Sequence, residues 1–374
     1  MIEQSAVISG VGRSAIGRRL QRDPWSLTID AALAAIADAG LSPADIDGLS
    51  TYPGATGSSP GITGAGVDDV RSLLGLKLRW YTGGGEVPGQ LGSIVNAVLA
   101  VAGGLANHVL CFRTVWESTA QTQLGGRSEV MRGVVVRDRN QWTEPYGAAY
   151  STYGALAMQR YMHDSGATRE QLGQIAVTAR ANAVDNPVAA YRTPMSLEDY
   201  LNARMISDPL CIYDCDVPVD GSIAFVVSRA DSDATDKGRC VTIRAIGSAS
   251  GFDECAAMMW SRTSLVPADV KLAELYDGFS ILAIFWMEAL GLCPHHGAGR
   301  FIAGGDAIAI DGKLPLNSGG GQLSGGRMHG YGGLFHACLQ LRGTAEGRQI
   351  TPYPDIAVVS SGTATFTSSL LLSR

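Results

Sequence analysis

Residues 186–228 read NPVAAYRTPMSLEDYLNARMISDPLCIYDCDVPVDGSIAFVVS, and this stretch decides the fold. Most of it is rich in proline, aspartate and other turn formers, which predicts a long connection. Its end, SIAFVVSRA at 222–230, is a continuous apolar run that predicts a buried strand. Two predicted helices, at 154–166 and 168–187, lead into the connection.

On the N-terminal side of this stretch, predicted strands and helices alternate. The strands lie at 5–14, 45–54 and 109–112, and the helices lie at 26–41 and within 93–108. A β-α-β rhythm implies parallel strands that are covered by helices. Residues 117–150 are irregular and polar, which predicts an inserted loop region.

The same rhythm restarts on the C-terminal side, after the linker-like DSDATDK at 231–237. A strand is predicted at 240–250, a buried helix at 279–294, a hairpin-like segment at 301–321 and two closing strands at 355–373. Two halves of similar rhythm that join near residue 235 predict a duplicated α/β layer sandwich.

Composition excludes several classes of function. Hydrophobic residues make up 46% of the 374-residue chain and charged residues only 17%, which favours a large core over disorder. The net charge of −6, without a basic run, argues against a nucleic-acid partner. No apolar stretch or N-terminal leader pattern predicts a membrane segment, and we expect a soluble cytoplasmic protein. The seven cysteines are scattered without a CxxC pair, so neither a disulfide framework nor a metal site is predicted.

The segment NSGGGQLSGGRMHGYGGL at 317–334 is the strongest candidate for a functional loop. Eight glycines surround Arg327, His329 and Tyr331, which stand at alternate positions. Glycine allows the backbone to approach a ligand closely and to offer its N–H donors. No phosphate-binding loop pattern is present, which argues against nucleotide hydrolysis. A thioester carbonyl is a suitable ligand for such a loop.

Five segments in the same order and spacing resemble the thiolase superfamily, in its sterol-carrier-protein thiolase-like, or lipid-transfer, branch. They are 157–177, 186–228, ELYDGFS at 274–280, LSGGRMHGYGGL at 323–334 and QLRG at 340–343. The resemblance covers nearly the whole chain. It implies an α/β fold, a thiolase-like duplicated five-layer α-β-α-β-α sandwich with an inserted loop region. The halves would be 1–235, with the loop region at about 113–210, and 236–374.

The catalytic positions of a thiolase are all substituted in this sequence. The nucleophilic cysteine would fall within 87–89, where no cysteine stands, and Cys111 on the next strand is interpreted as a buried small hydrophobe. The second catalytic cysteine would fall at Ser360 or Ser361. The histidine of the family aligns with Arg327, and the asparagine or histidine of its glutamate loop aligns with Tyr276.

These substitutions suggest a reaction without acyl transfer. The branch includes aldolases that cleave a 17-hydroxy steroid 20-carboxyl-CoA to a 17-ketosteroid and propionyl-CoA, with two catalytic tyrosines on these loops. By this resemblance the candidate catalytic residues are Tyr276 and Tyr331, with Arg327 and His329 beside them. The candidate substrate-binding residues are Asp277, Gly325, Gly326, Gly330, Gly332 and His296.

The chemistry of the tyrosines leaves alternatives open. Ionising a phenol at neutral pH costs about 4 kcal/mol, so a phenolate base needs a cation such as Arg327 nearby. Alternatively, a neutral tyrosine donates a proton to the enolate carbon, and His329 is the next base to test. In the plain structural alternative, Tyr276 is a core residue and Arg327 pairs with a carboxylate such as Asp277. The aspartates at 214, 216 and 220 are expected to make turn hydrogen bonds.

The resemblance also implies partners. It predicts a homodimer that forms around 85–102, and a small partner with an OB-fold and a zinc ribbon, which together give a heterotetramer. We expect no cofactor bound by this chain, with CoA present as part of the substrate. Two other functions remain open: a non-catalytic acyl-CoA or lipid carrier, and a thiolase or other acyl-CoA lyase with a displaced nucleophile.

Overall fold

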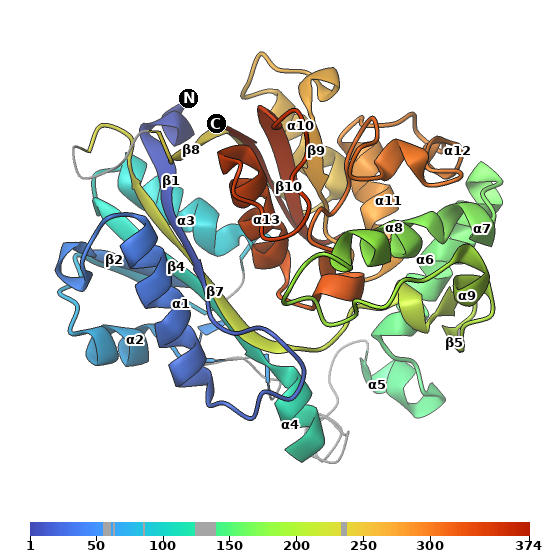
Figure 1. Cartoon of the computed structure of the whole chain (residues 1–374), viewed down its shortest axis with the longest axis horizontal. Helices are drawn as coiled ribbons and strands as arrows, with labels where there is room; N and C mark the ends of the chain where they lie inside the picture. Colours follow the sequence, from blue (N-terminus) through green and yellow to red (C-terminus); the bar gives the residue numbers. More distant parts are fainter. Residues whose placement is uncertain (55–60, 63, 85–86, 124–139, 233–237) are drawn as a thin grey trace.

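The computed structural model describes residues 1–54, 61–62, 64–84, 87–123, 140–232 and 238–374, and they form two halves (Figure 1). The strands of the N-terminal half are β1 (Ala6–Arg13), β2 (Gly48–Thr51), β3 (Trp80–Gly83), β4 (His108–Trp116) and β7 (Asp220–Arg229). Those of the C-terminal half are β8 (Val241–Ala249), β9 (Leu272–Glu274), β10 (Ile356–Thr363) and β11 (Phe366–Ser373).

The strands run in the order β3-β2-β4-β7-β1-β8-β11-β10-β9. The halves meet where β1 pairs with β8 over only two residue pairs, Val7 with Thr242 and Ile8 with Val241. Parallel pairs (β2 with β3 and β4, β9 with β10) stand beside antiparallel ones, so both parts of the sheet are mixed. We expected five strands in each half, and the described residues of the C-terminal half form four.

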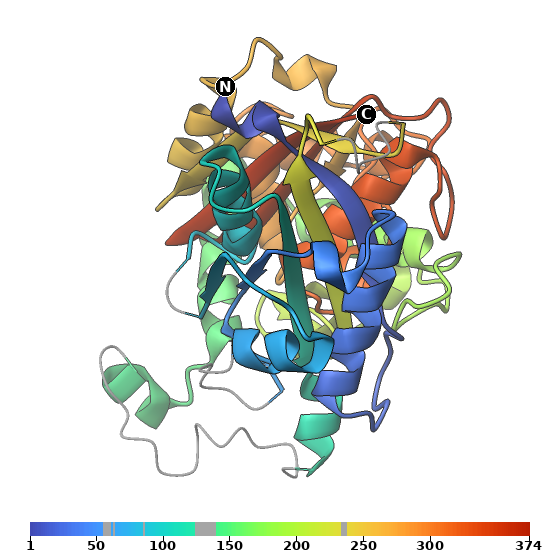
Figure 2. The same ribbon diagram turned by 90° about the vertical axis from the view of Figure 1, so that its left-hand side faces the viewer.

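Helices cover both parts of the sheet and fill the space between them (Figures 1 and 2). The outer helices are α1 (Pro24–Asp38) and α2 (Val67–Leu74) on one side and α10 (Phe252–Trp260) and α11 (Ser280–Ala289) on the other. The central helices are α3 (Gly92–Ala102) and α13 (Gly330–Arg342). The order of layers is therefore the predicted α-β-α-β-α.

Alternation of side chains along the strands produces these layers. On β4, Cys111 packs into the central core with α3 and α13, whereas Leu110 and Phe112 pack outward beside α1. On β10, Val359 belongs to the central core and Val358 to the outer core with α11. Because both faces of the central strands are covered, these strands are mostly apolar and buried, as the sequence pattern indicated.

The inserted region lies beside the C-terminal half. It contains α4 (Glu117–Gln123), α5 (Asn140–Thr143), α6 (Tyr150–Ser165), α7 (Arg169–Leu172), α8 (Gln174–Ala183), α9 (Leu197–Leu201), β5 (Met205–Ser207) and β6 (Leu210–Cys211). The predicted loop at 117–150 falls in part outside the described residues, as does the linker at 231–237.

The hairpin predicted at 301–321 is wrong. This segment follows α12 (Ala298–Phe301) with short turns and makes one strand-like bridge, between Leu316 and Ala273 of β9. Its glycines and its alternating apolar residues mimic a hairpin, but β9 already has a partner strand, β10, along one edge. Leu316 pairs on the other edge, and the described residues of 301–321 form turns and the 3-10 turn η8 (Asp306–Ile308) instead of two strands that pair with each other.

Candidate active site

The candidate site lies where the loop after β9, the π-helical turn η9 (Gly321–Gly325) and the start of α13 meet. A cavity of about 40 Å³ lies at this meeting point, with room for one water-sized group. Its polar lining includes Glu274, Tyr276, Asp277, Asn317, Gln322, His329, His336 and Ser360. The cavity is therefore large enough for a small polar group such as a carbonyl or a hydroxyl.

Tyr276 and Asp277 occupy the loop between β9 and α11. Tyr276 is 8% exposed and its backbone N–H donates to Ser360 Oγ at 3.2 Å. Burial raises the pKa of Tyr276 above its ordinary value, so the phenol is neutral at pH 7. The next glycine, Gly278, is required because a Cβ there would lie 2.9 Å from the Tyr276 ring.

Only one oxygen of the Asp277 carboxylate accepts a hydrogen bond from the described residues. Its Oδ1 accepts a hydrogen bond from the backbone N–H of Gln322 at 2.8 Å, whereas the buried Oδ2 has no partner among the described residues. Burial raises the pKa of Asp277 to about 6. Both side-chain polar atoms of Gln322 are likewise buried and unpartnered. The cavity lining thus offers both an acceptor and a donor to an incoming polar group.

Tyr331, the second residue of α13, lies deeper than Tyr276. It is fully buried, its hydroxyl makes a 2.7 Å hydrogen bond with Ser93 Oγ at the start of α3, and its ring packs on Phe225. Burial raises the pKa of Tyr331 well above its ordinary value. Tyr331 is not among the residues that line the cavity, although Gly330 and Gly332 on either side of it are.

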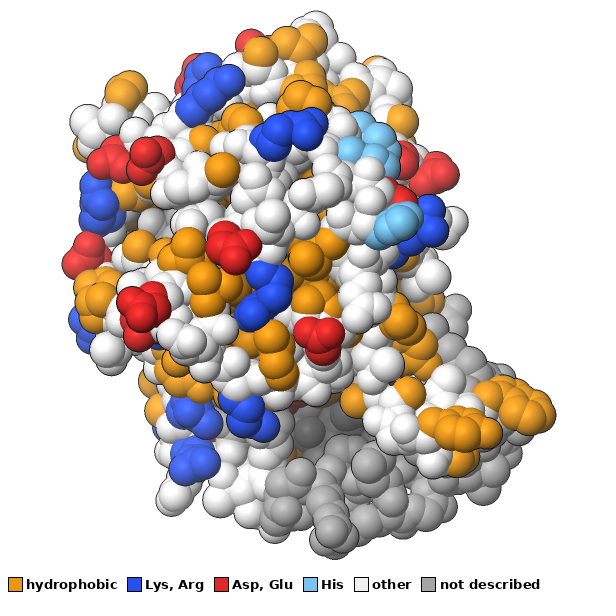
Figure 3. Space-filling view, turned by 90° about the vertical axis from the view of Figure 1, so that its right-hand side faces the viewer, with side chains coloured by type: hydrophobic (Ala, Val, Ile, Leu, Met, Phe, Trp, Pro, Cys, Tyr) orange, Lys and Arg blue, Asp and Glu red, His pale blue; other side chains and the backbone are white. Residues whose placement is uncertain are grey.

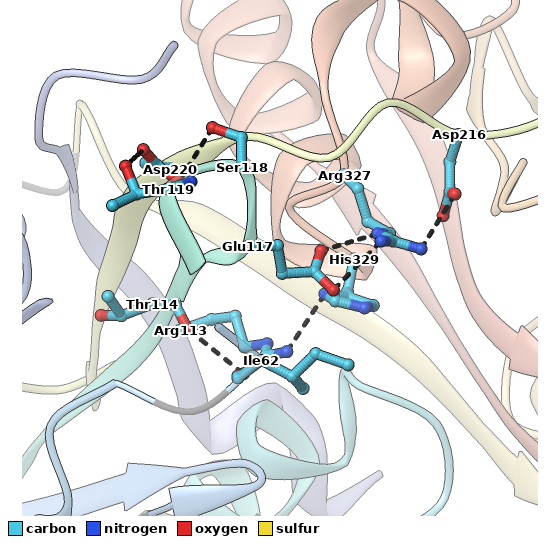
Figure 4. A network of polar contacts seen from close by, with 10 residues as sticks. All are labelled: Ile62, Arg113, Thr114, Glu117, Ser118, Thr119, Asp216, Asp220, Arg327 and His329. Carbon is cyan, nitrogen blue, oxygen red and sulfur yellow. Dashed lines mark hydrogen bonds and ion pairs between the residues drawn. The ribbon is translucent and has the colours of Figure 1, made fainter. Parts of the chain in front are cut away.

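Arg327 is held by carboxylates, but not by the one we expected. Its guanidinium makes a two-point ion pair with Glu117 of α4, at 2.7 and 3.0 Å, and a 3.1 Å contact with Asp216 (Figure 4). Burial works against this cation, but Asp216 and Glu117 raise the pKa of Arg327. Burial raises the pKa of Asp216 to about 7 even though Arg327 opposes the shift. The suggested pairing with Asp277 is therefore replaced by one with Glu117 and Asp216.

Arg113 on β4 is a site residue that sequence reasoning missed. It is 2% exposed, and its Nη2 donates to His329 Nδ1 at 3.2 Å (Figure 4). Its Nη1 donates to the carbonyls of Ile62, at 2.5 Å, and Thr114, at 3.3 Å. Burial lowers the pKa of Arg113 to about 10. A charged residue inside the apolar run HVLCFRTVW was the available signal.

The two tyrosines lie around this arginine. Burial lowers the pKa of Arg113, and Glu117 is the first of the groups that oppose this shift, ahead of Tyr331 and Tyr276. Tyr52, in the loop after β2, also opposes it. Two C-terminal loops and one N-terminal strand therefore bring phenols and a buried cation into one region.

The stretch 87–89, where the family resemblance places the thiolase nucleophile, packs closely against β10 at Gly89. Gly89, just before α3, has φ +61°, and a Cβ there would lie 2.7 Å from the Ser361 carbonyl oxygen of β10. The next residue, Gln90, exchanges hydrogen bonds with Ser361 Oγ at 2.5 and 3.2 Å. Cys111 is fully buried and its pKa is raised by burial, which confirms the interpretation as a core residue. A reactive thiolate is not available at this position.

Comparison with known proteins identifies the family to which the chain belongs. A family model described as the thiolase C-terminal domain-like family matches residues 233–374. Over its full length the chain is 32% identical to the full length of a 17-hydroxy-3-oxo-4-pregnene-20-carboxyl-CoA lyase of Mycobacterium tuberculosis. The chain belongs to the thiolase superfamily, in its sterol-carrier-protein thiolase-like branch.

The chain is also similar to a second curated relative and to two solved structures. The chain is 33% identical to a steroid side-chain-cleaving aldolase of Thermomonospora curvata, over 98% of this chain and 97% of the relative. A solved structure of an Ltp2-ChsH2(DUF35) aldolase superposes with a TM-score of 0.87 at 30% identity, over 100% of this chain and 99% of that one. An acetyl-CoA acetyltransferase from Syntrophomonas wolfei, with a TM-score of 0.66 at 18% identity over 99% of both chains, shares the fold.

The glycines of this thiolase-like loop border the cavity for different reasons. Gly325, Gly326, Gly330 and Gly332 all line it. Gly326 has φ +131° and would clash with Val219, while a Cβ at Gly330 would lie 2.5 Å from Ser361 Oγ, so both pack against the protein itself. Gly332 has only Met328 near it and is open. Binding of substrate by these glycines stays a prediction.

The structure places His296 apart from the cavity. Its backbone N–H donates to Glu288 Oε2, and its ring contacts Tyr161 and stacks on His295. Glu288 is eight residues beyond the start of α11, roughly 12 Å along the helix, whereas Tyr276 and Asp277 lie just before that start. The role of His296 in substrate binding therefore stays a prediction.

The remaining sequence expectations concern aspartates, metal and membrane. Asp214 is fully buried and accepts a turn hydrogen bond from the backbone N–H of Cys211, as predicted. Asp220 is also fully buried, but it accepts hydrogen bonds from the distant Leu20 and Thr119 and not within a turn. Asp216 differs, because it pairs with Arg327. Among the described residues no group of three or more His, Cys, Asp or Glu side chains could hold a metal ion. Within the same residues, no helix combines the length and apolar character needed to cross a membrane.

Proposed function

We propose that the chain is an acyl-CoA retro-aldolase. This carbon–carbon lyase cleaves a β-hydroxyacyl-CoA with a tertiary hydroxyl carbon into a ketone and a shorter acyl-CoA. The substrate class is a 17-hydroxy steroid 20-carboxyl-CoA, and the products are a 17-ketosteroid and propionyl-CoA. One observation carries the proposal: Gly89, within the stretch predicted for the nucleophile, packs against the β10 backbone, while phenols stand near a buried cation.

The reaction needs proton carriers and a holder for the enolate, but no nucleophile. The bond between Cα and Cβ breaks, and its electron pair passes into the thioester as an enolate. The β-hydroxyl loses its proton and becomes the ketone, and the enolate carbon gains a proton. Tyr276 and Tyr331 carry these protons, because a phenol oxygen can accept one proton while it passes on another.

The environment of the phenols supports this role in the neutral form. Burial raises the pKa of Tyr276 and that of Tyr331, so neither is a phenolate at neutral pH. Of the two alternatives from the sequence, the neutral proton donor is thus favoured over the phenolate base. Ser93 provides Tyr331 with a second hydroxyl through which a proton can pass. The small cavity beside Tyr276 fits the thioester and hydroxyl region of the substrate.

The test is cleavage of a tertiary β-hydroxyacyl-CoA in the absence of free CoA. We expect release of a ketone and a shorter acyl-CoA, detected by chromatography of both products. A strict requirement for free CoA would show thiolysis by a displaced nucleophile instead. Binding without turnover across a panel of hydroxyacyl-CoA substrates would show a carrier.

We also propose a homodimer and a small partner protein with an OB-fold and a zinc ribbon, which together form a heterotetramer in the cytoplasm. For the dimer, β3 is an edge strand with Tyr81 66% exposed, and Leu99 of the neighbouring α3 is 50% exposed. For the partner, Trp142, Tyr146 and Tyr150 are 72%, 88% and 77% exposed. Apolar side chains gather at this projecting segment around α5 (lower right of Figure 3). Exposed apolar clusters of this kind are typical of protein interfaces.

A further inference from the structure

Arg113 is a buried cation without a direct ion pair, and Glu117, the carboxylate that acts on it most strongly, is itself bound by Arg327. Among the described residues no carboxylate lies within ion-pair distance of it, whereas Arg327 contacts two. Within the part of the chain that the structure describes, the Nε of Arg113 has no hydrogen-bond partner, and Nη1 donates to main-chain carbonyls. An unpaired buried charge is strongly unfavourable, so its presence calls for an anion that arrives during function.

The contact of Arg113 with His329 determines where the imidazole carries its proton. A guanidinium nitrogen can only donate, so Nδ1 of His329 must accept at 3.2 Å. The proton of the neutral imidazole is then on Nε2. Burial, with Arg113 and Arg327 adding to it, holds the pKa of His329 well below its ordinary value. His329 is also partly exposed and borders the cavity beside Tyr276.

We propose that Arg113 is a positioning residue that holds His329 as a neutral hydrogen-bond donor to the thioester oxygen of the substrate. This inference rests on the proposed retro-aldol function. As the bond between Cα and Cβ breaks, charge develops on that oxygen, and His329 Nε2–H donates to it without giving up its proton. The charge of Arg113 strengthens this donor through the ring, and the enolate supplies a counter-ion. His329 is accordingly a donor and not the base.

Several other charged or titratable groups face this pair. They are Arg327, Glu117, Asp216, Tyr52, Tyr276 and Tyr331. Glu117 and Asp216 are both engaged by Arg327. Asp216, with a pKa of about 7, titrates in the working range, but it is present in both wild type and an Arg113 variant. A ratio of the two rates at each pH therefore removes its contribution.

The first experiment compares Arg113→Met and Arg113→Lys with wild type from pH 5.5 to 8.5, using kcat/KM for the hydroxyacyl-CoA. At pH 8 we expect Arg113→Met to be slower by about 10²-fold, the usual effect of a lost oxyanion donor. Without the adjacent cation the pKa of His329 rises, so acidification protonates the ring and restores a cationic donor. The ratio of variant to wild-type rate should therefore increase as the pH falls. A ratio that decreases on acidification would identify His329 as a base and overturn the proposal.

Arg113→Lys tests the charge separately from the geometry. A lysine keeps the positive charge, so we expect its rate at pH 8 to exceed that of Arg113→Met by several-fold. Equal rates in the two variants would contradict a role for the charge. Thermal unfolding of each variant identifies any that fails to fold, and the wild-type experiment below does not depend on either of them.

The second experiment determines which ring nitrogen of His329 is protonated, by ¹⁵N-histidine NMR on the wild-type assembly. The chain has 6 histidines, and loss of one signal in His329→Gln assigns the ring. We expect Nδ1 to be unprotonated and Nε2 protonated from pH 5.5 to 8. A protonated Nδ1 in wild type would overturn the proposal, whatever the activity of the protein.

Arg342→Met is the matched control. Arg342 is a buried arginine of α13, but it pairs with Asp38 far along the helix from His329. We expect a lower melting temperature and a rate ratio that does not change with pH. If wild type itself fails to cleave any hydroxyacyl-CoA, the proposed function fails, and the NMR result still decides the protonation state of His329.

Discussion

Introducing a cysteine at Gly89 should fail to recreate a thiolase and should destabilise the protein. Gly89 stands within the predicted nucleophile position, with φ +61°. A Cβ there would lie 2.7 Å from the Ser361 carbonyl oxygen and 2.9 Å from Ser368 Oγ. Ser361 and Ser368 face each other in the β10–β11 pair, so neither can move away without disturbing the sheet.

Two costs add up in Gly89→Cys. The left-handed backbone costs an L-residue roughly 1–2 kcal/mol. The overlap with two strands adds about 1–3 kcal/mol, the range for overpacking a well-filled core. Gly104, at the other end of α3, provides the matched control because it has φ +72° and nothing within 4 Å. Gly104→Cys should show the backbone cost alone, so the two variants should differ by about 1–3 kcal/mol.

Urea unfolding followed by circular dichroism measures this difference, and thiolysis of a β-ketoacyl-CoA with free CoA measures the chemistry. We expect no thiolysis above that of Gly104→Cys, because the family resemblance aligns Arg327 and the serines at 360 and 361 with the thiolase histidine and second cysteine. Equal stability of the two variants would refute the steric argument. CoA-dependent thiolysis by Gly89→Cys alone would refute the claim that the site is rebuilt for another reaction.

Three further predictions follow from the same geometry. Tyr276→Phe and Tyr331→Phe should each lower kcat by about 10²-fold or more in steady-state kinetics, with little change in substrate binding. Unchanged rates in both variants would show that neither phenol takes part in the mechanism. Burial raises the pKa of Asp277 to about 6 in the folded protein, so the free energy of unfolding falls as the pH rises from about 4 to 6. Asp277→Asn removes this ionisation, and its free energy of unfolding should exceed that of wild type by up to roughly 3 kcal/mol at pH 8 but by little at pH 4. A gain of equal size at both pH values in urea titrations would argue against this shift. Light scattering at micromolar concentration should give twice the chain mass, as expected for a dimer with an interface above about 2,000 Å². A monomeric mass would exclude the dimer. Full turnover by the chain alone would show that the partner protein is dispensable.

Much of the architecture follows from the sequence because its signals are local. The apolar runs at 109–112 and 222–230 predicted buried strands, and both lie within strands of the structure, β4 and β7. The alternation of strands and helices on both sides of residue 235 predicted two similar halves, and the family resemblance implied the five layers. The division of the chain at 235 itself stays a prediction. The hairpin predicted at 301–321 is wrong because glycines and alternating apolar residues also fit a chain of turns, which is what this segment forms.

The site depended on contacts that no local pattern contains. The sequence identified Tyr276, Tyr331, Arg327 and His329 as candidates, and their catalytic roles stay predictions. It did not predict that Arg327 is held by Glu117, 210 positions away, or that Arg113 binds His329 across 216 positions. In the sequence Arg113 is one charge inside an apolar strand, and Arg327 is one cation with several possible carboxylates.

The tertiary structure decided which charges are paired and which are not, because pairing depends on the distance between atoms from different elements and on how much water is excluded from them. The chain alone determines which residues are apolar, where turns form and that no cysteine stands within 87–89. Only the tertiary contact between β4 and the residue before α13 buries Arg113 beside His329 Nδ1, with no carboxylate of the described residues within ion-pair distance. Desolvation then sets the protonation of His329, Tyr276 and Asp277, since burial opposes the charged form of each group.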